Sequence, residues 1–231
     1  MMNNIVHSMN EFDVYQDERK STLFKINSKT NCNCLSLYNS IIKNNSVNSA
    51  TIINNTLIIK AVSIKPFKKF KEEQYLKNNT YRLPYICILS IINFLSKQLY
   101  YLLENENKCF YTFDPTNILV VNDCKFLYLS NEHLKEIKKN NICIYNPIKK
   151  NIGYLSPELQ NVSSIPIIIN YKTIFYSLGL LIIDNLVDEL VDDNVKDVLI
   201  DNNLNIKDNK LYYFLERCLY NEPNKRFLLY I

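Results

Sequence analysis

Glycine is nearly absent from this chain of 231 residues, which contains only Gly153 and Gly179. No glycine precedes residue 153, so the first half of the chain has no glycine-rich loop that would let the backbone approach a polyphosphate closely. Histidine is also scarce, and the seven cysteines include no CxxC pair. Because His7 and His133 complete no zinc spacing with the cysteines, we expect no structural zinc site and predict that the thiols are reduced.

A signal sequence and long apolar runs are missing as well. The N-terminus, MMNNIVHSMNEFD, is polar and has no apolar signal core. The longest apolar runs, residues 165–169 and 178–183, are too short to span a bilayer. Since 47% of the residues are hydrophobic and 22% are charged, the composition is typical of a globular protein with a substantial core. We therefore expect an intracellular protein, cytoplasmic or nuclear rather than secreted, without a transmembrane segment.

The formal net charge of +4 is too small to indicate a nucleic-acid-binding protein by itself. The charges are unevenly placed, however. Every charged residue from Arg19 to Lys71 is lysine or arginine, whereas every charged residue in 184–201 except Lys196 is acidic. Solvated surfaces are the simpler explanation of such stretches. Binding of nucleic acid or anionic lipid through residues 19–71, notably residues 65–71 (KPFKKFK), is therefore a minor alternative.

The hydrophobic pattern is strand-like near the N-terminus and helical further along the chain. Residues 1–20 are polar and charged, and we expect them to form a flexible tail. The predicted elements are strands over residues 22–26, 50–53, 56–62, 118–121 and 125–129, and helices over residues 34–43, 84–104, 173–186, 193–200 and 211–220. Asn54-Asn55 and Asn122-Asp123 are predicted turns, and residues 130–153 are predicted to be a long loop.

Four segments of the mainly helical part resemble successive motifs of protein kinases. They are residues 114–120 (DPTNILV), like the KPENILV end of the catalytic loop; residues 153–158 (GYLSPE), like the GTxxYxAPE end of the activation segment; residues 172–179 (KTIFYSLG), like KSDIYSLG; and residues 218–226 (CLYNEPNKR), like CLxxDPxKR. Each match is weak alone, but the four stand in the order of the family. The chain therefore resembles the protein kinase-like superfamily. The resemblance implies a two-lobed α+β fold, with a reduced, β-rich N-lobe and hinge over residues 21–82 and a mainly helical C-lobe over residues 83–231.

The resemblance also implies structural roles for three residues. Glu158 and Arg226 match positions that form a buried ion pair in the family. Removing one partner of such a pair costs roughly 3–5 kcal/mol, because a charge is left buried and unpaired. The presence of both residues indicates that this lobe must fold. Gly179 is expected to let its helix pack closely against its neighbours.

The catalytic loop has lost the reactive residues of the family. When Asn117 is aligned with the metal-binding asparagine, Thr112 stands at the position of the catalytic aspartate, and a hydroxyl cannot accept a proton as a carboxylate does at neutral pH. Phe110 and Tyr111 replace the histidine and arginine that precede that aspartate. Asp114 stands at the position of the catalytic-loop lysine and is only a remote candidate for a catalytic role.

The nucleotide-binding residues are reduced in the same way. Tyr-Leu-Ser at residues 128–130 replaces the Asp-Phe-Gly motif, so Tyr128 stands where the metal-binding aspartate is expected and Mg²⁺ would have Asn117 alone. If residues 56–62 lead into the hinge, Lys25 is the candidate for the phosphate-contacting lysine, and Lys60 is the alternative. The helix after Lys25 has no glutamate to pair with it, because no acidic residue lies between Glu18 and Glu72.

These losses predict a catalytically inactive pseudokinase that acts as a regulatory or scaffolding binding module. No cofactor is expected. The predicted partner is a protein, either an active kinase or a kinase substrate. The alternative is a divergent protein kinase that still binds ATP with Mg²⁺ through Lys25 and Asn117 and transfers phosphate to serine or threonine side chains of proteins.

Overall fold

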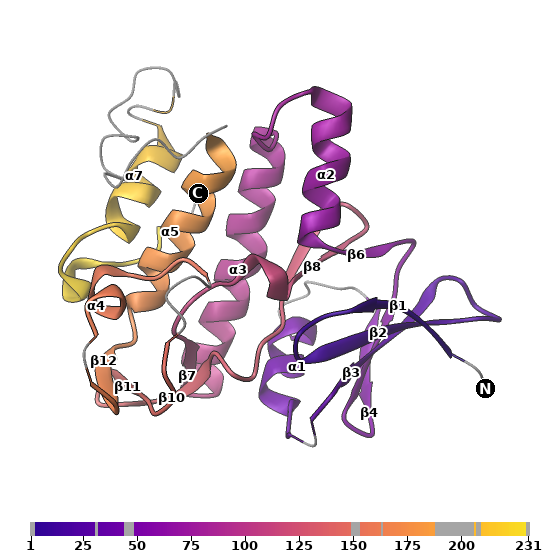
Figure 1. Cartoon of the computed structure of the whole chain (residues 1–231), viewed down its shortest axis with the longest axis horizontal. Coiled ribbons are helices and arrows are strands. Elements are labelled where there is room, and N and C mark those ends of the chain that lie inside the picture. The colour runs from indigo at the N-terminus through magenta and orange to yellow at the C-terminus, as the bar shows by residue number, and fades with distance from the viewer. Residues whose placement is uncertain are drawn as a thin grey trace. The chain divides into compact units, whose positions relative to one another are not determined.

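The computed structural model of the chain describes residues 3–30, 32–43, 49–148, 153–162, 164–187, 206 and 209–229 (Figure 1). It combines helices with antiparallel sheets, so the prediction of an α+β protein is confirmed. The chain divides into two compact units. The first comprises residues 1–73, 94–107 and 115–132, and the second comprises residues 74–93, 108–114 and 133–231. Each unit is assembled from separate stretches of chain, unlike the predicted segments 21–82 and 83–231.

The largest sheet lies in the first unit and has five strands in the order β1-β2-β3-β5-β4. The strands are β1 (Asn3–Ser8), β2 (Phe12–Asp17), β3 (Leu23–Ser28), β4 (Ala50–Ile53) and β5 (Thr56–Lys60). Alternate side chains of β2, β3 and β5 are buried, among them Val14, Ile26 and Ile59. This alternation is expected for strands with one face on a core. Asn54 and Asn55 have positive φ angles of 48° and 57° between β4 and β5, which confirms the predicted turn.

Helix α1 (Leu35–Ile42) packs against this sheet. Leu37, Tyr38 and Ile41, which lie on one side of the helix, are fully buried. The ring of Tyr38 is 6.3 Å from the ring of Phe12, and its hydroxyl donates to the carbonyl oxygen of Ile26 at 3.3 Å. The helix and the sheet therefore share one apolar core.

The flexible tail predicted for residues 1–20 is wrong, because residues 3–8 and 12–17 form strands β1 and β2. In β2, the apolar residues Phe12 and Val14 are buried and alternate with the less buried Asp13 and Tyr15. The polar residues around them conceal this period of two, because the segment is too short for the pattern to stand out.

A second sheet of the first unit contains β6 (Ile64–Pro66), β8 (Ile118–Val121) and β9 (Lys125–Tyr128) in the order β6-β8-β9. The β8–β9 connection uses Asn122 and Asp123 with φ angles of 52° and 58°, which confirms that turn. Helix α2 (Phe67–Asn78) follows β6. Phe67 and Phe70 of this helix pack at 6.0 and 5.6 Å against the ring of Phe126 on β9. The sequence pattern does not indicate α2, because these two phenylalanines are its buried residues and most of the others are charged or polar.

Helix α3 (Tyr85–Asn105) contributes residues to both units. Among the described helices, it is the one that is long and apolar enough to cross a membrane by length and composition. The core helix of a soluble protein passes the same test. Ile88, Leu95 and Leu99 are buried, and the helix carries Lys97 and the buried Gln98 within its length. The structure is therefore compatible with the predicted absence of a transmembrane segment.

The second unit contains a four-stranded sheet in the order β12-β11-β10-β7. Its strands are β7 (Lys108–Phe110), β10 (Leu134–Lys138), β11 (Asn141–Ile144) and β12 (Ile167–Asn170). The prediction of a loop over residues 130–153 is wrong for β10 and β11, which form a hairpin with Lys139 and Asn140 at φ angles of 50° and 64°. Ile137 and Ile142 are buried in this hairpin. The lysines and asparagines between such residues obscure the strand pattern in the sequence.

The helices of the second unit include α4 (Pro157–Gln160), α5 (Thr173–Leu186) and α7 (Lys210–Cys218). The prediction for α5 has the correct bounds, and the helix predicted over residues 193–200 lies outside the described residues. Gly179 of α5 faces the end of α7. A Cβ atom at this position would lie 2.9 Å from Cδ2 of Leu219 and 3.2 Å from Cβ of Cys218, so the glycine permits the close approach of the two helices.

Candidate functional site

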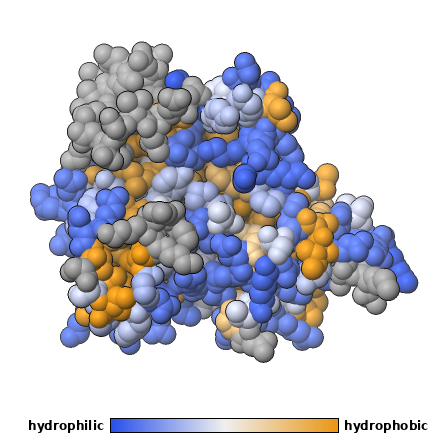
Figure 2. All heavy atoms as spheres, in the orientation of Figure 1, coloured by the Kyte–Doolittle hydropathy of each residue, from blue (hydrophilic) through white to orange (hydrophobic). Residues whose placement is uncertain are grey.

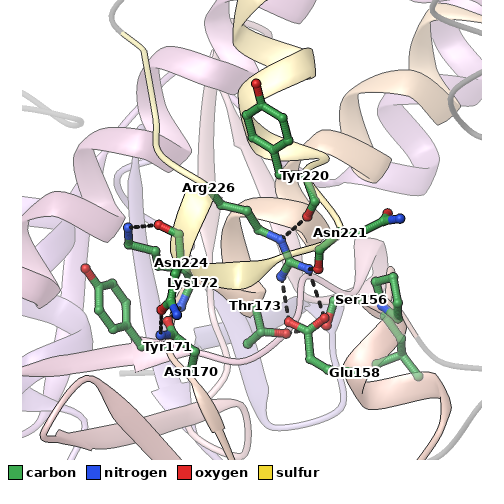
Figure 3. A network of polar contacts seen from close by, with 12 residues as sticks. Ser156, Glu158, Asn170, Tyr171, Lys172, Thr173, Tyr220, Asn221, Asn224 and Arg226 are labelled. Atoms are coloured by element: carbon green, nitrogen blue, oxygen red, sulfur yellow. Dashed lines mark hydrogen bonds and ion pairs between the residues drawn. The ribbon is translucent and has the colours of Figure 1, made fainter.

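Glu158 and Arg226, the predicted structural pair, form an ion pair in the second unit (Figure 3). The Arg226 side chain is 0% exposed, and its terminal nitrogens donate to the two carboxylate oxygens of Glu158 at 2.5 and 2.9 Å. Arg226 also donates through Nε to the carbonyl oxygen of Tyr220 at 2.6 Å and through a terminal nitrogen to the carbonyl oxygen of Asn221 at 2.8 Å. The ring of Tyr176 lies 4.9 Å from the guanidinium carbon. The buried positive charge is thus compensated by a bidentate carboxylate and by carbonyl dipoles.

Further hydrogen bonds extend this network to β12 and to the start of α5 (Figure 3). The hydroxyl groups of Ser156 and Thr173 are 2.5 Å apart. Asn224 accepts from Lys172 Nζ through its backbone oxygen at 3.1 Å and from Asn170 Nδ2 through its side-chain oxygen at 2.9 Å. The network joins segments that are distant in the sequence, and its contacts stabilise the packing of these segments against one another.

Thr112, which the sequence comparison aligns with the catalytic aspartate of kinases, is 1% exposed. Its hydroxyl donates to the carbonyl oxygen of Tyr154 at 3.2 Å and lies 3.3 Å from the hydroxyl of Ser177 on α5. Ser177 also accepts the backbone N–H of Phe113 at 2.7 Å. Gly153 packs closely against the same segment. Its φ is +75°, and a Cβ atom at this position would lie only 2.7 Å from the carbonyl oxygen of Phe113, so the position requires glycine. The Thr112 hydroxyl therefore takes part in the internal hydrogen bonds of this segment.

Asp114, the remote catalytic candidate, is also buried, at 4% exposure. Nearby in the same unit, the phenol of Tyr154 donates to the carboxylate of Asp184 at 2.6 Å. Burial raises the pKa of Tyr154, and the charges of Asp184 and Asp114 raise it further. The phenol keeps its proton as a result, and the buried carboxylate of Asp114 contributes to this by its charge.

The two aromatic residues before Thr112 are part of the core of the second unit. Phe110 is fully buried, pairs with Leu134 across β7 and β10, and lies 6.2 Å from the ring of Phe113. The ring of Tyr111 is 4.9 Å from that of His133, whose carbonyl oxygen accepts the Tyr111 N–H at 3.1 Å. The two residues that the sequence comparison aligns with the histidine and arginine of the kinase motif are therefore packing residues.

Asn117 and Tyr128 lie side by side in the first unit, before β8 and at the end of β9. Asn117 is 2% exposed, its backbone oxygen accepts the N–H of Leu129 at 2.9 Å, and its Oδ1 atom has no hydrogen-bond partner. Tyr128 is 0% exposed, and its backbone N–H and C=O pair with the side-chain amide of Gln98 at 3.0 and 2.8 Å. An amide and a phenol at these two positions offer Mg²⁺ no carboxylate, which is the ligand that it prefers.

Lys25 lies on β3, and its Nζ atom is 3.9 Å from Oδ2 of Asp17. The helix that follows, α1, contains no acidic residue that could pair with it. Lys60, the alternative lysine, is the last residue of β5 and is exposed. Lys25 therefore pairs with a carboxylate on the neighbouring strand instead of a carboxylate on the helix.

Glu11 was not identified by any sequence pattern, although it makes some of the strongest polar contacts of the first unit. It lies in the turn between β1 and β2. Its carboxylate accepts hydrogen bonds from the hydroxyl of Ser130 at 2.5 Å and from the N–H groups of Asn131 and Glu132 at 2.9 and 3.0 Å. Successive backbone N–H groups of this kind form an anion-binding nest. Backbone N–H groups have no sequence signature, so no pattern in the sequence indicates this contact.

His7 is a second residue that sequence reasoning missed, because it was considered only as a zinc ligand. Its Nε2 atom on β1 lies 2.9 Å from the carbonyl oxygen of Ile64, just after residues 56–62, which are expected to lead into the hinge. Burial lowers the pKa of His7, and the charges of Lys69 and Lys65 lower it further, although the hydrogen bond to Ile64 opposes them. The neutral imidazole, with its proton on Nε2, satisfies this carbonyl group.

The predicted site residues are divided between the two units. Lys25, Asn117 and Tyr128 belong to the first unit, and Thr112 and Asp114 belong to the second. Within the part of the chain that the structure describes, no three His, Cys, Asp or Glu side chains gather as a metal site. Comparison with models of protein families and with curated proteins finds no match.

An exposed apolar groove of about 560 Å³ lies on the four-stranded sheet of the second unit. Its apolar lining includes Tyr145 and Ile168, which are 72% and 69% exposed. Lys135, Lys138 and Lys139 also line it, with Glu136 as the acidic residue among them. Figure 2 shows the apolar atoms gathered at the lower left, where Figure 1 places β11 and β12. Exposed apolar surface of this kind, rimmed by charges, is typical of interaction sites.

Proposed function

We propose that this protein is a pseudokinase, with a protein kinase-like two-lobed fold but no phosphoryl transfer, and that it acts as a regulatory or scaffolding binding module. The environment of Tyr128 carries the proposal. Phosphoryl transfer requires carboxylate ligands for Mg²⁺ and a base for the acceptor hydroxyl. Tyr128 supplies a buried ring at the metal-ligand position, and Thr112 supplies an internally bonded hydroxyl at the position of the base.

The topology of the first unit supports the kinase-like part of the proposal. Kinases carry the phosphate-contacting lysine on the third strand and its glutamate partner on the helix that follows. Lys25 lies on the third strand of the chain, and α1 follows it, whereas Lys60 lies on the fifth. This arrangement favours Lys25 over Lys60 as the counterpart of that lysine. The missing helix glutamate and the Lys25–Asp17 pair then support the loss of activity.

Glu11 supports the same proposal from the phosphate side. In kinases the loop between the first two strands is rich in glycine and covers the phosphates. Here the corresponding turn places a carboxylate on the N–H groups of residues 131 and 132. A nucleotide phosphate approaching these groups would meet a negative charge that is already bound there.

For the partner, we propose a protein segment with apolar side chains flanked by acidic residues, which binds the groove on β10, β11 and β12. The exposed Tyr145 and Ile168 supply apolar contact area, and the lysines at 135, 138 and 139 outnumber the single acidic residue, Glu136. Charge complementarity of this kind steers association and selects partners. An active kinase or a kinase substrate with such a segment would suit the scaffolding role.

The catalytic part of the proposal is tested with radiolabelled ATP, Mg²⁺ and general protein substrates. We expect no phosphate transfer above that of a Thr112→Ala variant. Transfer well above this control would show that the chain is an enzyme and would end the pseudokinase proposal.

The partner is tested by fluorescence anisotropy with two labelled peptides that share an Ile/Val-rich centre and differ in glutamate or lysine flanks. We expect the glutamate peptide to bind, and Ile168→Asp to weaken its binding at least about tenfold by adding a repelling charge. Ile53→Asp, at an exposed position of β4 in the first unit, is the matched control and should bind normally. Equal binding of both peptides, or no binding of either, would contradict the proposed surface.

The alternative, a divergent kinase that still binds ATP, is favoured by one observation, the unpartnered Oδ1 atom of Asn117. A buried carbonyl oxygen without a donor is costly unless a ligand satisfies it. A thermal-shift measurement with ATP and Mg²⁺ discriminates between the two proposals. A stabilisation that is lost in Asn117→Ala supports the alternative, and unchanged melting at millimolar nucleotide supports the pseudokinase.

A further inference from the structure

Two cysteines outside the sites described above lie together in the first unit. Cys32 and Cys34 precede α1, and their sulfur atoms are 3.5 Å apart. Cys34 is 0% exposed, whereas Cys32 is only partly buried. The pair thus combines one accessible sulfur with a second, protected sulfur directly beside it.

The fold holds this geometry through the side chain of Asn55, in the turn between β4 and β5. Its Nδ2 atom donates to the carbonyl oxygen of Cys32 at 2.9 Å, and its Oδ1 atom accepts the N–H of Cys34 at 3.3 Å. Asn33, between the cysteines, accepts the N–H of Leu35 at 2.9 Å and fixes the start of α1. The proximity of the two sulfurs therefore depends on the folded chain as well as on their spacing in the sequence.

Hydrogen-bond donors surround the Cys32 sulfur. Thr30 and Asn131 donate to it at 3.0 and 3.1 Å, and the hydroxyl of Ser28 is 3.2 Å away. Burial opposes ionisation, but the hydrogen bonds from Ser28, Thr30 and Cys34 outweigh it and lower the pKa of Cys32. Burial raises the pKa of Cys34. Because the thiolate is the nucleophile, Cys32 is the reactive member of the pair.

Three of the other cysteines, Cys109, Cys124 and Cys218, provide a contrast within the same chain. Cys109 and Cys218 are fully buried, and burial raises the pKa of both thiols. Cys124 is exposed, and its sulfur is 4.0 Å from the carbonyl oxygen of Val121. Among the described residues, no third His, Cys, Asp or Glu joins the Cys32–Cys34 pair as a metal ligand. The pair is therefore better suited to oxidation than to metal binding.

We propose that Cys32 and Cys34 form an oxidation site for hydroperoxides. The Cys32 thiolate attacks one oxygen of ROOH, the O–O bond breaks, and the products are a sulfenic acid on Cys32 and RO⁻, which takes a proton from water. The sulfur of Cys34 then attacks the sulfur of Cys32. The S–S bond forms, the S–O bond breaks, and hydroxide leaves with the Cys34 proton as water. Two thiols are oxidised to a disulfide while one hydroperoxide is reduced to an alcohol or, for hydrogen peroxide, to water.

The test treats the folded, full-length chain with hydrogen peroxide, blocks the thiols with N-ethylmaleimide and analyses tryptic peptides by mass spectrometry. Cleavage after Lys29 and Lys43 leaves both cysteines on one peptide, residues 30–43. We expect this peptide to lose two hydrogens at peroxide concentrations that leave Cys124 as a free thiol. Recovery of the peptide with two blocked thiols, or earlier oxidation of Cys124, would overturn the proposal.

Two further measurements separate the role of the fold from that of the sequence spacing. In guanidinium chloride, the unfolded chain should form the disulfide several-fold more slowly than the folded protein, and equal rates would contradict a prepared site. In Cys34→Ser, oxidation should stop at the sulfenic acid, which dimedone traps on Cys32. Absence of that adduct would show that Cys32 is not the attacking sulfur. The wild-type peptide measurement stands even if this variant folds poorly.

Discussion

Arg226 in the second unit and Tyr128 in the first are both fully buried, and each is held by hydrogen bonds from a distant part of the chain. Around Arg226, the side chain itself is charged and meets a carboxylate and two carbonyl groups. Around Tyr128, the amide of Gln98 pairs with the backbone, and the buried side chain adds an uncharged ring to the core. A charged side chain thus ties distant segments together at Arg226, whereas under the proposed function an uncharged ring lies where a kinase would bind its metal.

Among the substitutions that test this comparison, removal of the carboxylate at Glu158 should lower the free energy of unfolding most. Glu158→Ala leaves the Arg226 guanidinium buried without its partner, so we expect the free energy of unfolding to fall by about 3–5 kcal/mol. Urea denaturation measures this loss. Glu222→Ala is the matched control, because Glu222 pairs with Lys225 at 2.9 Å with side chains that are 67% and 60% exposed, and its cost should be below about 1 kcal/mol. Equal losses in both variants would contradict the special role of the buried pair.

Replacement of Gln98 tests the other side of the comparison. Gln98→Leu replaces the amide on α3 by an apolar side chain of similar size and removes the hydrogen-bond partner of the Tyr128 N–H and C=O groups. We expect a loss of about 1–3 kcal/mol for these unsatisfied groups, measured by the same denaturation. Gln160→Leu, at an exposed position with one hydrogen bond to Leu155, should cost clearly less. A neutral Gln98→Leu variant would show that Tyr128 is not fixed by this amide.

Substitution of Thr112 tests whether its hydroxyl stabilises the fold through internal hydrogen bonds. Thr112→Val removes the hydrogen bonds to Tyr154 and Ser177 with little change of shape, so stability should fall by about 1 kcal/mol. Thr112→Ser, which keeps the hydroxyl, should recover most of that loss. If Thr112→Val were as stable as the wild type, the internal role of the hydroxyl would be wrong.

The smallest expected effect is the pH dependence that His7 contributes. Its pKa in the folded protein is lowered, chiefly by burial, so the unfolded chain binds the proton more readily. The contribution of His7 to the free energy of unfolding is therefore full above the ordinary histidine pKa of about 6.5. It falls as the pH decreases toward the lowered pKa of the folded protein. The difference in unfolding free energy between the wild type and His7→Asn should be constant above that pH and decrease below it. A difference that grows on acidification would reverse the assigned sign.

The sequence was a good guide where the pattern is long or the turn chemistry is specific. Helix α5 and the turns at Asn54-Asn55 and Asn122-Asp123 are where periodicity and asparagine preferences place them. It failed for β1, β2, β10 and β11, because short strands rich in charged and polar residues show little alternation. It also missed α2, whose packing depends on two phenylalanines.

At the candidate site, the sequence could predict only which residues of the kinase motifs are missing. The residue types at Thr112 and Tyr128 can be read from the aligned motifs, but what their side chains contact depends on the tertiary structure. Glu11 could not be found in the same way, because its carboxylate meets backbone N–H groups about 120 residues away, and such groups have no sequence signature. The contacts of His7 and Cys32 were hidden for the same reason.

The central claim is that the nucleotide-binding positions hold the protein's own side chains instead of the groups that bind Mg²⁺–ATP. Isothermal titration of the full chain with Mg²⁺–ATP, beside an Asn117→Ala variant, tests it most directly. The account predicts no saturable heat at millimolar nucleotide for either protein. Saturable binding to the wild type that is lost in Asn117→Ala would contradict it and would favour the divergent kinase.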